Sequence, residues 1–326
     1  MTHSGFDTGF DTDAAVDVRG LMKSYGDVHA VAGVDLRIEP GEIFALLGPN
    51  GAGKTTTVEI LEGYRRQDGG EVRVLGLDPA RDSARLKKRI GIVLQSTGVD
   101  GYLTVAESIA MYSGFYPHPR PVDEVIELVG LAGKRDARVL RLSGGQQRRL
   151  DVAIALAGDP ELLFLDEPTT GFDPSARHEA WQVVKNLAEL GKTVLLTTHY
   201  MDEAQFLADR VAVIVAGRVV AEGTPSTLGG RDAARPVISY RLAADVLPPP
   251  GLGSPASPDG VLRLMPEDLT AALHALTGWA LENAVTLMDL RIERPSLEDV
   301  YLGLTTAGPP GSREPAADPT AKGTRR

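Results

Sequence analysis

Three continuous apolar runs stand out in the first two thirds of the chain. They cover residues 42–48 (EIFALLG), 161–167 (ELLFLDE) and 192–199 (KTVLLTTH), and the last two end in polar residues. Runs of this length are typical of parallel strands that are buried on both faces. Because ligands bind beyond the carboxyl ends of such strands, the polar residues there are candidates for one shared site.

The segments around the first run predict further strands and a helix. Residues 16–38 alternate often enough between apolar and polar side chains to predict short strands with turns at Gly20, Gly26 and Gly33. A glycine-rich loop follows the run at 42–48, and residues 55–66 (TTTVEILEGYRR) then predict a helix. The order strand, glycine loop, helix is therefore expected here.

Helical spacing of apolar residues dominates residues 104–157. We therefore expect a helical lobe at about 96–158, inserted into an α/β domain that spans 16–229. The two ends, 1–15 and 307–326, are rich in Gly, Pro, Ser or charged residues and contain little that could be buried. Both ends are predicted to be disordered.

The texture of the sequence changes after residue 229 and predicts a small second α/β domain over 230–306. Strands flank a proline-rich loop, and a helix is expected to begin near Pro266. Three leucines share one face of that helix: Leu269, Leu273 and Leu276. Residues 285–292 then alternate like a strand, and Ser296 and Asp299 have the spacing of a capping box at the start of a last helix.

Composition excludes several classes of protein. The 326 residues are 43% hydrophobic, which is enough for a sizeable core, and the net charge of −10 argues against a nucleic-acid partner. No apolar run approaches the roughly 18 residues of a membrane span, and the N-terminus has no apolar signal core. The absence of cysteine excludes disulfides, thiolate metal sites and cysteine nucleophiles. A cytosolic protein is expected.

The glycine-rich loop fits the phosphate-loop pattern G-x-x-x-x-G-K-[ST] at every fixed position of residues 48–55 (GPNGAGKT). Its lysine, Lys54, would neutralise the β- and γ-phosphates of a nucleotide, and the Thr55 hydroxyl would bind Mg²⁺. The expected nucleotide contacts are Gly48, Pro49, Asn50, Gly51, Ala52, Gly53, Lys54, Thr55 and Thr56. An accidental glycine turn would lack the strand and the helix that flank this loop.

Two acidic residues, Asp166 and Glu167, stand side by side at the end of the run 161–167. Asp166 suits a contact to Mg²⁺, and Glu167 suits a general base that polarises an attacking water. Taken alone, two acids at a strand end are more often the start of a solvated loop. With a phosphate loop upstream, the catalytic interpretation is the better one.

A second pair of glycines begins another helical pattern in residues 142–157 (LSGGQQRRLDVAIALA). A helix N-terminus with adjacent glycines favours anion binding, so the chain has a second candidate site for phosphate. The motif LSGGQ resembles the signature of the ATP-binding subunits of ABC transporters. The resemblance covers roughly residues 18–223, with the motifs in the family's order. It implies a P-loop ATPase core: a mostly parallel sheet, an antiparallel β-subdomain and an inserted helical lobe.

The resemblance also explains the second phosphate site, because two such subunits pair head to tail around two ATP. Each signature then faces the γ-phosphate held by the partner's phosphate loop. The implied contacts of the signature are Ser143, Gly144, Gly145 and Gln146. Asp173 matches the loop that crosses the dimer interface, where Phe172 replaces the usual leucine. A homodimer that binds ATP and Mg²⁺ is expected.

Three further residues match functional positions of the family. Tyr25 matches the aromatic that stacks on adenine, and Gln95 matches the glutamine that contacts Mg²⁺ and the attacking water. His199 matches the histidine that senses the γ-phosphate. Without this context, Tyr25 would be an ordinary strand tyrosine, and Gln95 a polar strand end. The remaining histidines are interpreted as structural: His3, His29, His118, His178 and His274.

The ending RPSLEDVYLGLT, residues 294–305, is similar to that of subunits serving drug exporters of the daunorubicin-resistance type. The similarity implies a separate membrane permease, with a short permease helix docking near residues 96–112, and a place at the cytoplasmic face of the membrane. An ordinary capped helix is the alternative for this ending. Three other functions stay open: a soluble ABC-type ATPase acting on nucleic acid or ribosomes, a kinase that shares the phosphate loop, and an importer.

Overall fold

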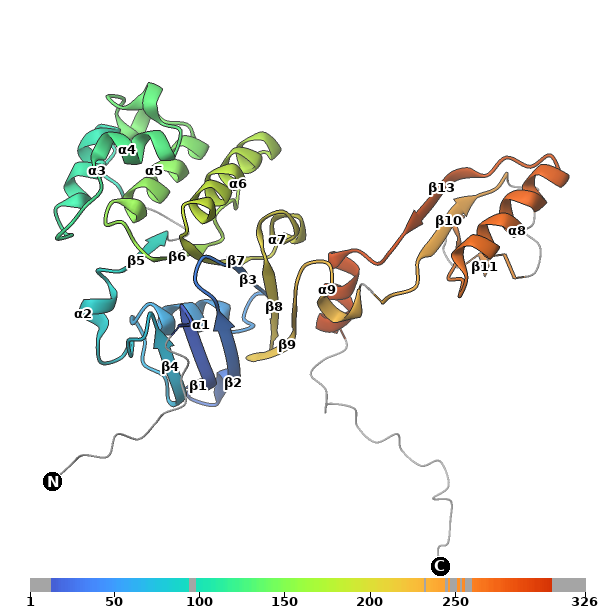
Figure 1. Cartoon of the computed structure of the whole chain (residues 1–326), viewed down its shortest axis with the longest axis horizontal. Helices are drawn as coiled ribbons and strands as arrows, with labels where there is room; N and C mark the ends of the chain where they lie inside the picture. The colour runs from blue at the N-terminus through green and yellow to red at the C-terminus, as the bar shows by residue number, and fades with distance from the viewer. Residues whose placement is uncertain are drawn as a thin grey trace, which may run out of the picture.

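A six-stranded sheet forms the centre of the computed structural model, with strand order β5-β6-β7-β3-β8-β9 (Figure 1). The first five strands in that order run parallel, and β9 runs antiparallel to β8. Their bounds are β3 Ile43–Leu47, β5 Ile90–Val93, β6 Leu162–Asp166, β7 Thr193–Thr198, β8 Arg210–Val215 and β9 Arg218–Gly223. The structure describes residues 13–93, 98–231, 233–243, 246, 251–252, 254–255 and 260–306.

Both faces of this sheet are covered, which confirms the three predicted buried strands. All five residues of β3 are buried, and they alternate between two hydrophobic clusters. Ile43, Ala45 and Leu47 pack with the helices of the lobe and with α6 and α7, whereas Phe44 and Leu46 pack toward β1, β2 and α1. Burial on both sides is the reason that these runs contain no alternating polar residues.

A three-stranded antiparallel sheet, order β2-β1-β4, covers the second face through β1 Val16–Tyr25, β2 Val28–Ile38 and β4 Gly69–Val74. Of the three predicted turns, only the one at Gly26 is present. Gly20 (φ 57°) and Gly33 (φ 92°) lie inside β1 and β2, where the register shifts. They are bulges, because a glycine with positive φ can absorb an extra residue without ending the strand. The predictions of turns at Gly20 and Gly33 are therefore wrong.

The described part of the N-terminus is ordered further than predicted. Ala14 and Ala15 are buried, and the Ala15 N–H donates to the Ile38 carbonyl at 2.9 Å. The prediction of disorder over 1–15 is therefore wrong for these two residues, since they extend the N-terminal end of β1, the middle strand of the antiparallel sheet. Residues 1–12, the proline-rich residues 247–250 and the tail 307–326 lie outside the described residues.

Helices connect the strands and form the expected helical lobe. The lobe contains α3 Val105–Ser113, α4 Val122–Leu128 and α5 Gly144–Leu156, with the 3₁₀ turns η1 Ala132–Lys134 and η2 Val139–Arg141. The other helices of the core are α1 Lys54–Leu61, α2 Ser83–Leu86, α6 Pro174–Glu189 and α7 Met201–Leu207. The helix predicted over 55–66 stops at Leu61 because Gly63 takes a left-handed conformation, φ 75°, which ends a helix.

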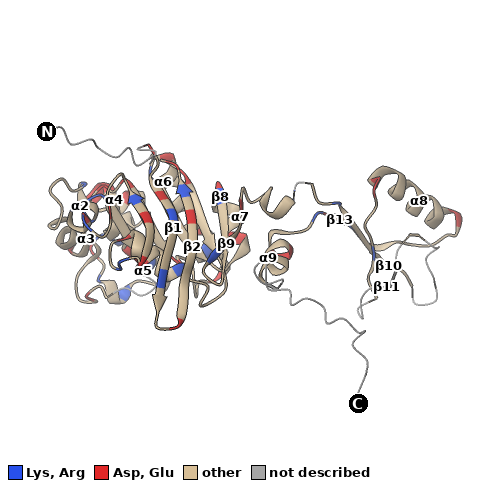
Figure 2. Cartoon of the chain, turned by 90° about the horizontal axis from the view of Figure 1, so that it is seen from below, with Lys and Arg blue, Asp and Glu red and all other residues tan. Residues whose placement is uncertain are grey.

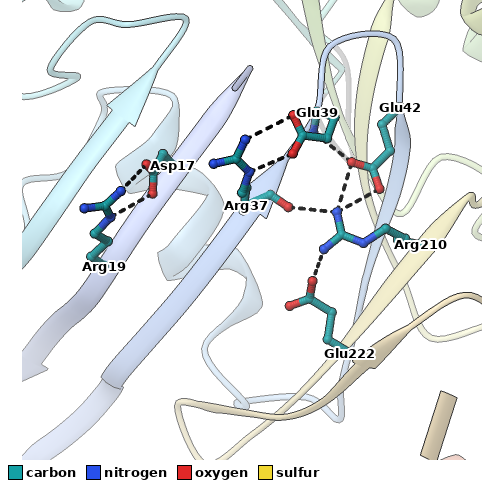
Figure 3. Close-up of polar contacts among 7 residues, drawn as sticks. All are labelled: Asp17, Arg19, Arg37, Glu39, Glu42, Arg210 and Glu222. Carbon is teal, nitrogen blue, oxygen red and sulfur yellow. Dashed lines mark hydrogen bonds and ion pairs between the residues drawn. The ribbon is translucent and has the colours of Figure 1, made fainter. Parts of the chain in front are cut away.

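The edge of the sheet where its parallel strands begin is held by charged side chains (Figure 3). Arg210, at the start of β8, donates to Glu42 at 3.1 Å and to the Arg37 carbonyl at 3.2 Å, and it pairs with Glu222. Burial raises the pKa of Glu42. Charges of both signs also follow β1 and β2 (Figure 2). This ionic cluster ties β2, β8 and β9 together at the edge opposite the phosphate loop.

The C-terminal part forms a second small sheet, order β11-β12-β10-β13, with α8 on one face (Figure 1). Its elements are β10 Val237–Arg241, β11 Ser254–Pro255, β12 Leu262–Leu264, α8 Leu269–Glu282 and β13 Met288–Glu293. The predicted leucine face of α8 is present, with Leu276 fully buried against Ile238 and Tyr240. This small α/β unit has a hydrophobic core of its own.

The last helix, α9 Leu297–Thr306, leaves the small sheet and packs on the main core. Ser296 and Asp299 form the predicted capping box. Leu297 is 1% exposed, and α9 lies against α7 and the 3₁₀ turn η3 Leu228–Gly230. Arg231, which precedes the small sheet, is hydrogen-bonded to the segment that follows it: its Nε donates to the Pro295 carbonyl at 2.7 Å. The segment that forms the small sheet therefore begins and ends at neighbouring positions, next to Arg231 and Pro295.

Replacing Leu297 with Ala should lower the free energy of unfolding of the main core by about 2–4 kcal/mol, the usual cost of a cavity at a fully buried leucine. Leu302 is the matched control, because it lies on the same helix and is 49% exposed. Its replacement with Ala should cost less than about 0.5 kcal/mol. Urea unfolding followed by tryptophan fluorescence compares the two. Equal effects would mean that α9 does not stabilise the core.

Candidate functional site

The glycine loop between β3 and α1 has a shape that only glycine can form at two positions. A Cβ at Gly48 would lie 2.4 Å from the Ile214 carbonyl oxygen, and one at Gly53 would lie 2.2 Å from the Ala30 carbonyl oxygen. Gly53 also has φ 105° and is the residue that precedes α1. The loop is therefore pressed against neighbouring backbone, and its N–H groups face the space in front of the helix.

Lys54 begins α1 and is the buried cation of this loop, 7% exposed. Its Nζ donates to the carbonyls of Gly48 at 2.6 Å and Pro49 at 3.1 Å. Burial lowers the pKa of Lys54, while the charges of Glu167 and Asp166 act in the opposite direction. A lysine held this way beside a helix N-terminus attracts phosphate strongly.

The loop, β6 and β7 together line one cavity of about 700 Å³. Asp166 and Glu167 reach it from the end of β6, His199 from just beyond β7, and Tyr25 from the end of β1. Among the residues that the structure describes, the lining is Tyr25, Ala30, Asn50, Gly51, Gly53, Lys54, Thr55, Thr56, Asp166, Glu167 and His199. Ten of these eleven residues were expected from the sequence. Gln95 lies outside the described residues.

Glu167 is held in a fixed and strained position at the cavity wall. Its φ of 45° is left-handed, which is rare outside glycine and is found mainly where surrounding contacts enforce it. Its Oε1 lies 3.2 Å from His199 Nδ1, and its Oε2 accepts from the Thr170 hydroxyl at 3.1 Å. Such a carboxylate is placed to accept a proton from a water in the cavity.

The cavity also contains oxygen ligands of the kind that Mg²⁺ prefers. The Thr55 hydroxyl and the Asp166 carboxylate line it together. Asp166 Oδ1 accepts a hydrogen bond from the Thr197 hydroxyl, which leaves its other carboxylate oxygen for a further partner. This fixed carboxylate is a suitable donor for a divalent cation.

The signature lies on a different surface from the cavity. Ser143 caps α5 in a capping box with Gln146: the Gln146 N–H donates to Ser143 Oγ at 3.3 Å, and the Ser143 N–H to Gln146 Oε1 at 3.1 Å. Ser143 and Gly144 are exposed, and so is Asp173, which caps α6 by accepting from the Ser175 N–H at 2.9 Å. None of these residues lines the cavity.

Sequence analysis missed two buried charged residues that hold the loop after β6. Arg148 on α5 is 8% exposed, and its guanidinium donates to the carbonyls of Asp166 at 2.9 Å and Pro168 at 3.0 Å. Glu203 on α7 is fully buried and accepts from the Thr169 hydroxyl at 2.7 Å. In the sequence, each of these residues is only a charged position among the apolar residues of a helix. That pattern does not show which distant group the charge will contact.

Known protein families and relatives match this chain over most of its length. Residues 31–170 match the family described as ABC transporter, and 237–296 match the C-terminal domain of proteins similar to ABC transporter domain-containing proteins. The chain is 40% identical over 306 residues to the daunorubicin resistance ATP-binding protein DrrA3 of Streptomyces coeruleorubidus, which covers 90% of this chain and 96% of that protein.

It is also 39% identical over 304 residues to the Nod factor export ATP-binding protein I of Rhizobium sp. (strain N33), over 89% of this chain and 97% of that one. Among solved structures, it resembles the dimeric post-hydrolysis state of the ATP-binding cassette MJ0796 bound to ADP and Pi, with 28% identity and a TM-score of 0.57. That match covers 64% of this chain and 98% of the other. These relatives give no support to a kinase or to an ATPase acting on nucleic acid or ribosomes.

No helix within the described residues is both long enough and apolar enough to cross a bilayer.

Glu62, the residue that follows α1, is a buried acid near the site that the sequence did not single out. It is 3% exposed, and burial raises its pKa to about 8, with the negative charges of Asp166 and Glu59 adding to the effect. Glu62 is therefore mostly protonated at neutral pH in the folded protein. In the unfolded chain its pKa returns toward 4.5, so the folded state binds one more proton between these two values.

The free energy of unfolding should therefore fall as pH rises from about 4.5 to about 8, and Glu62→Gln should remove this loss. At about 1.4 kcal/mol per pH unit, the variant should be more stable than the wild type by roughly 3–5 kcal/mol at pH 9 and equal to it at pH 4. Thermal and urea unfolding at both pH values measures the difference. A difference that does not change with pH would rule out the raised pKa.

Proposed function

This chain belongs to the ATP-binding subunits of ABC transporters, and from that membership we propose that it powers export through a separate membrane permease. The chain is an ATPase subunit of a transporter, and its relatives are named as ATP-binding proteins of drug resistance and of Nod factor export. Both relatives cover nearly all of this chain, including the C-terminal part. We infer an exporter, with a drug-like or otherwise hydrophobic compound as its cargo.

The chain binds and hydrolyses ATP, and the cavity gives its residues distinct roles. Tyr25 stacks on adenine, as the resemblance implies, while the loop N–H groups and Lys54 hold the phosphates. Glu167 is the proposed general base, and the cavity with its fixed carboxylate is the observation that carries this assignment. His199, which contacts Glu167, senses the γ-phosphate, and Gln95 orients the attacking water.

We propose Mg²⁺ as the cofactor bound with ATP. Thr55 and Asp166, which line the cavity, would hold it together with Gln95. When bound, the ion neutralises charge on the β- and γ-phosphates. The oxygen-only donor set and the loop too tight for any Cβ at Gly53 both support this assignment.

The second phosphate-binding surface supports a head-to-tail homodimer. Ser143, Gly144, Gly145 and Gln146 lie away from the chain's own cavity, so they would contact ATP held by a second copy. Asp173, also exposed, would cross the interface. Dimerisation is known for the cassette MJ0796. In this mechanism ATP favours the closed pair, and hydrolysis releases it.

The permease is proposed to dock on the helical lobe near residues 96–112, from the cytoplasmic face of the membrane. Within this segment, Tyr102 is 75% exposed and Met111 is 47% exposed, and Phe115 just beyond it is 74% exposed. Exposed large apolar side chains within one segment support a protein partner there. The proposed domains are 16–229 for ATP binding, 230–306 as an accessory unit, and 1–15 and 307–326 as the ends.

Glu167→Gln should leave ATP binding intact and lower hydrolysis about 100-fold or more, since loss of a general base typically costs 10²–10⁴-fold. The trapped ATP should make the dimer accumulate. The control is Glu161→Gln, at the other end of β6, where the carboxylate pairs with Arg89 instead of lining the cavity. Phosphate release and light scattering with ATP measure both effects. An unchanged hydrolysis rate would remove Glu167 from its catalytic role.

Transport itself is tested by purifying the tagged protein from gently solubilised membranes of its native host. We expect a partner with about six spans, each of roughly 20 apolar residues, to purify with it. The control is the same purification in high salt and detergent without ATP. Recovery of soluble protein or ribosomes alone would contradict the exporter and favour a soluble ATPase.

A further inference from the structure

Four side chains from three elements form a continuous stack that ends at the catalytic pair. The Arg177 guanidinium on α6 lies over the Tyr200 ring, 4.4 Å from its centre. The Tyr200 ring in turn packs on the His199 imidazole, with 4.1 Å between ring centres and 38° between planes. His199 Nδ1 lies 3.2 Å from Glu167 Oε1. Each member therefore touches the next.

The stack has an anchored end and a catalytic end. Arg177 pairs with Asp202 at 3.2 Å, and its side chain is 20% exposed, so its position over the ring is held by α7 as well as by α6. The backbone of Tyr200 is fixed by a hydrogen bond from its N–H to Thr198 Oγ1 at 3.0 Å. The His199 side chain, by contrast, is 41% exposed, and it contacts the Tyr200 ring and the Glu167 carboxylate.

An exposed imidazole needs a wall against which to keep one orientation, because its χ2 torsion has broad minima. A tyrosine ring supplies such a contact for the imidazole, and the Arg177 cation over the same ring adds a favourable interaction that holds the ring in place. Within the part of the chain that the structure describes, the Tyr200 hydroxyl forms no hydrogen bond. The ring, not the hydroxyl, is thus the part of Tyr200 that bears on His199.

We propose that Tyr200 is a positioning residue that keeps the His199 imidazole against Glu167, and that Arg177 holds Tyr200 in place from α6. This inference rests on the proposed roles of Glu167 and His199 in ATP hydrolysis. Arg177 is one helical turn from Asp173, which caps α6 and belongs to the proposed dimer interface. A movement of the N-terminal end of α6 on dimer closure would therefore reach His199 through Arg177 and Tyr200.

The test compares ring removal with ring retention at residue 200 in the full-length protein. Tyr200→Leu should lower kcat about 10- to 100-fold, the size expected when a catalytic group is misplaced, with little change in the Kd of a fluorescent ATP analogue. Tyr200→Phe keeps the ring and should restore kcat to within about 2-fold of the wild type, well inside the loss expected for a misplaced group. Arg177→Met should lower kcat by an intermediate factor.

Phe206→Leu is the matched control. Phe206 lies on α7, the helix that follows Tyr200, but its ring stacks on Trp181, with 5.0 Å between ring centres, and not on His199. It should leave kcat unchanged, and melting temperatures check that every variant is folded. If Tyr200→Leu does not fold, the kcat of Arg177→Met tests the inference, since this variant keeps the Tyr200 ring but removes the cation that holds it.

Three outcomes would overturn the inference: full kcat in Tyr200→Leu, an equal loss in Tyr200→Phe, or proportional loss of ATP binding and kcat. His199→Ala separates this inference from the proposed function. If His199→Ala abolishes hydrolysis while Tyr200→Leu keeps full kcat, only the positioning role is wrong. If His199→Ala retains full activity, the role proposed for His199 itself is wrong.

Discussion

Burial of the central sheet on both faces is the constraint on which the rest of the structure depends. With helices on one side and the antiparallel sheet on the other, polar side chains can reach water only where the strands end. β3, β6 and β7 are parallel neighbours, so their carboxyl ends meet at one edge. The glycine loop, the pair Asp166 and Glu167, and His199 are brought together for this reason, although they are distant in sequence.

Two buried charged residues, Arg148 and Glu203, hold the end of β6 and the loop that follows it in place. The Arg148 guanidinium donates to the carbonyl of Asp166, at the end of β6, and to that of Pro168, in the loop that follows. Glu203 accepts a hydrogen bond from Thr169 in the same loop. A left-handed backbone at a residue such as Glu167 costs of order 1–3 kcal/mol and persists only when neighbours enforce it. Because Arg148 lies on the helix that begins with the signature, the strained backbone at Glu167 is physically connected to the signature, the second candidate site for phosphate.

The parts of this fold that the sequence predicted are those set by short-range chemistry. Buried strands, the phosphate loop and the capping box at Ser296 depend on residues close together in the chain, and all three are present. The turns predicted at Gly20 and Gly33 were wrong because a glycine in the sequence indicates a positive φ but does not distinguish a turn from a bulge within a strand. Arg148 and Glu62 were missed because their importance depends on burial by distant segments, which no local pattern encodes.

The docking of α9 shows how far such tertiary effects reach. α7 has only seven residues, and an isolated helix of that length is unstable in water, so its position depends on packing. Leu297, Tyr301 and Leu304 of α9 supply part of that packing, in the same cluster as Ala204 and Leu207 of α7. Tyr200 precedes α7 and His199 precedes Tyr200, so the helix stabilised by α9 begins close to His199 in the cavity lining. The small C-terminal sheet is therefore anchored, through α9, to the helix that begins two residues after His199, a residue of the cavity lining.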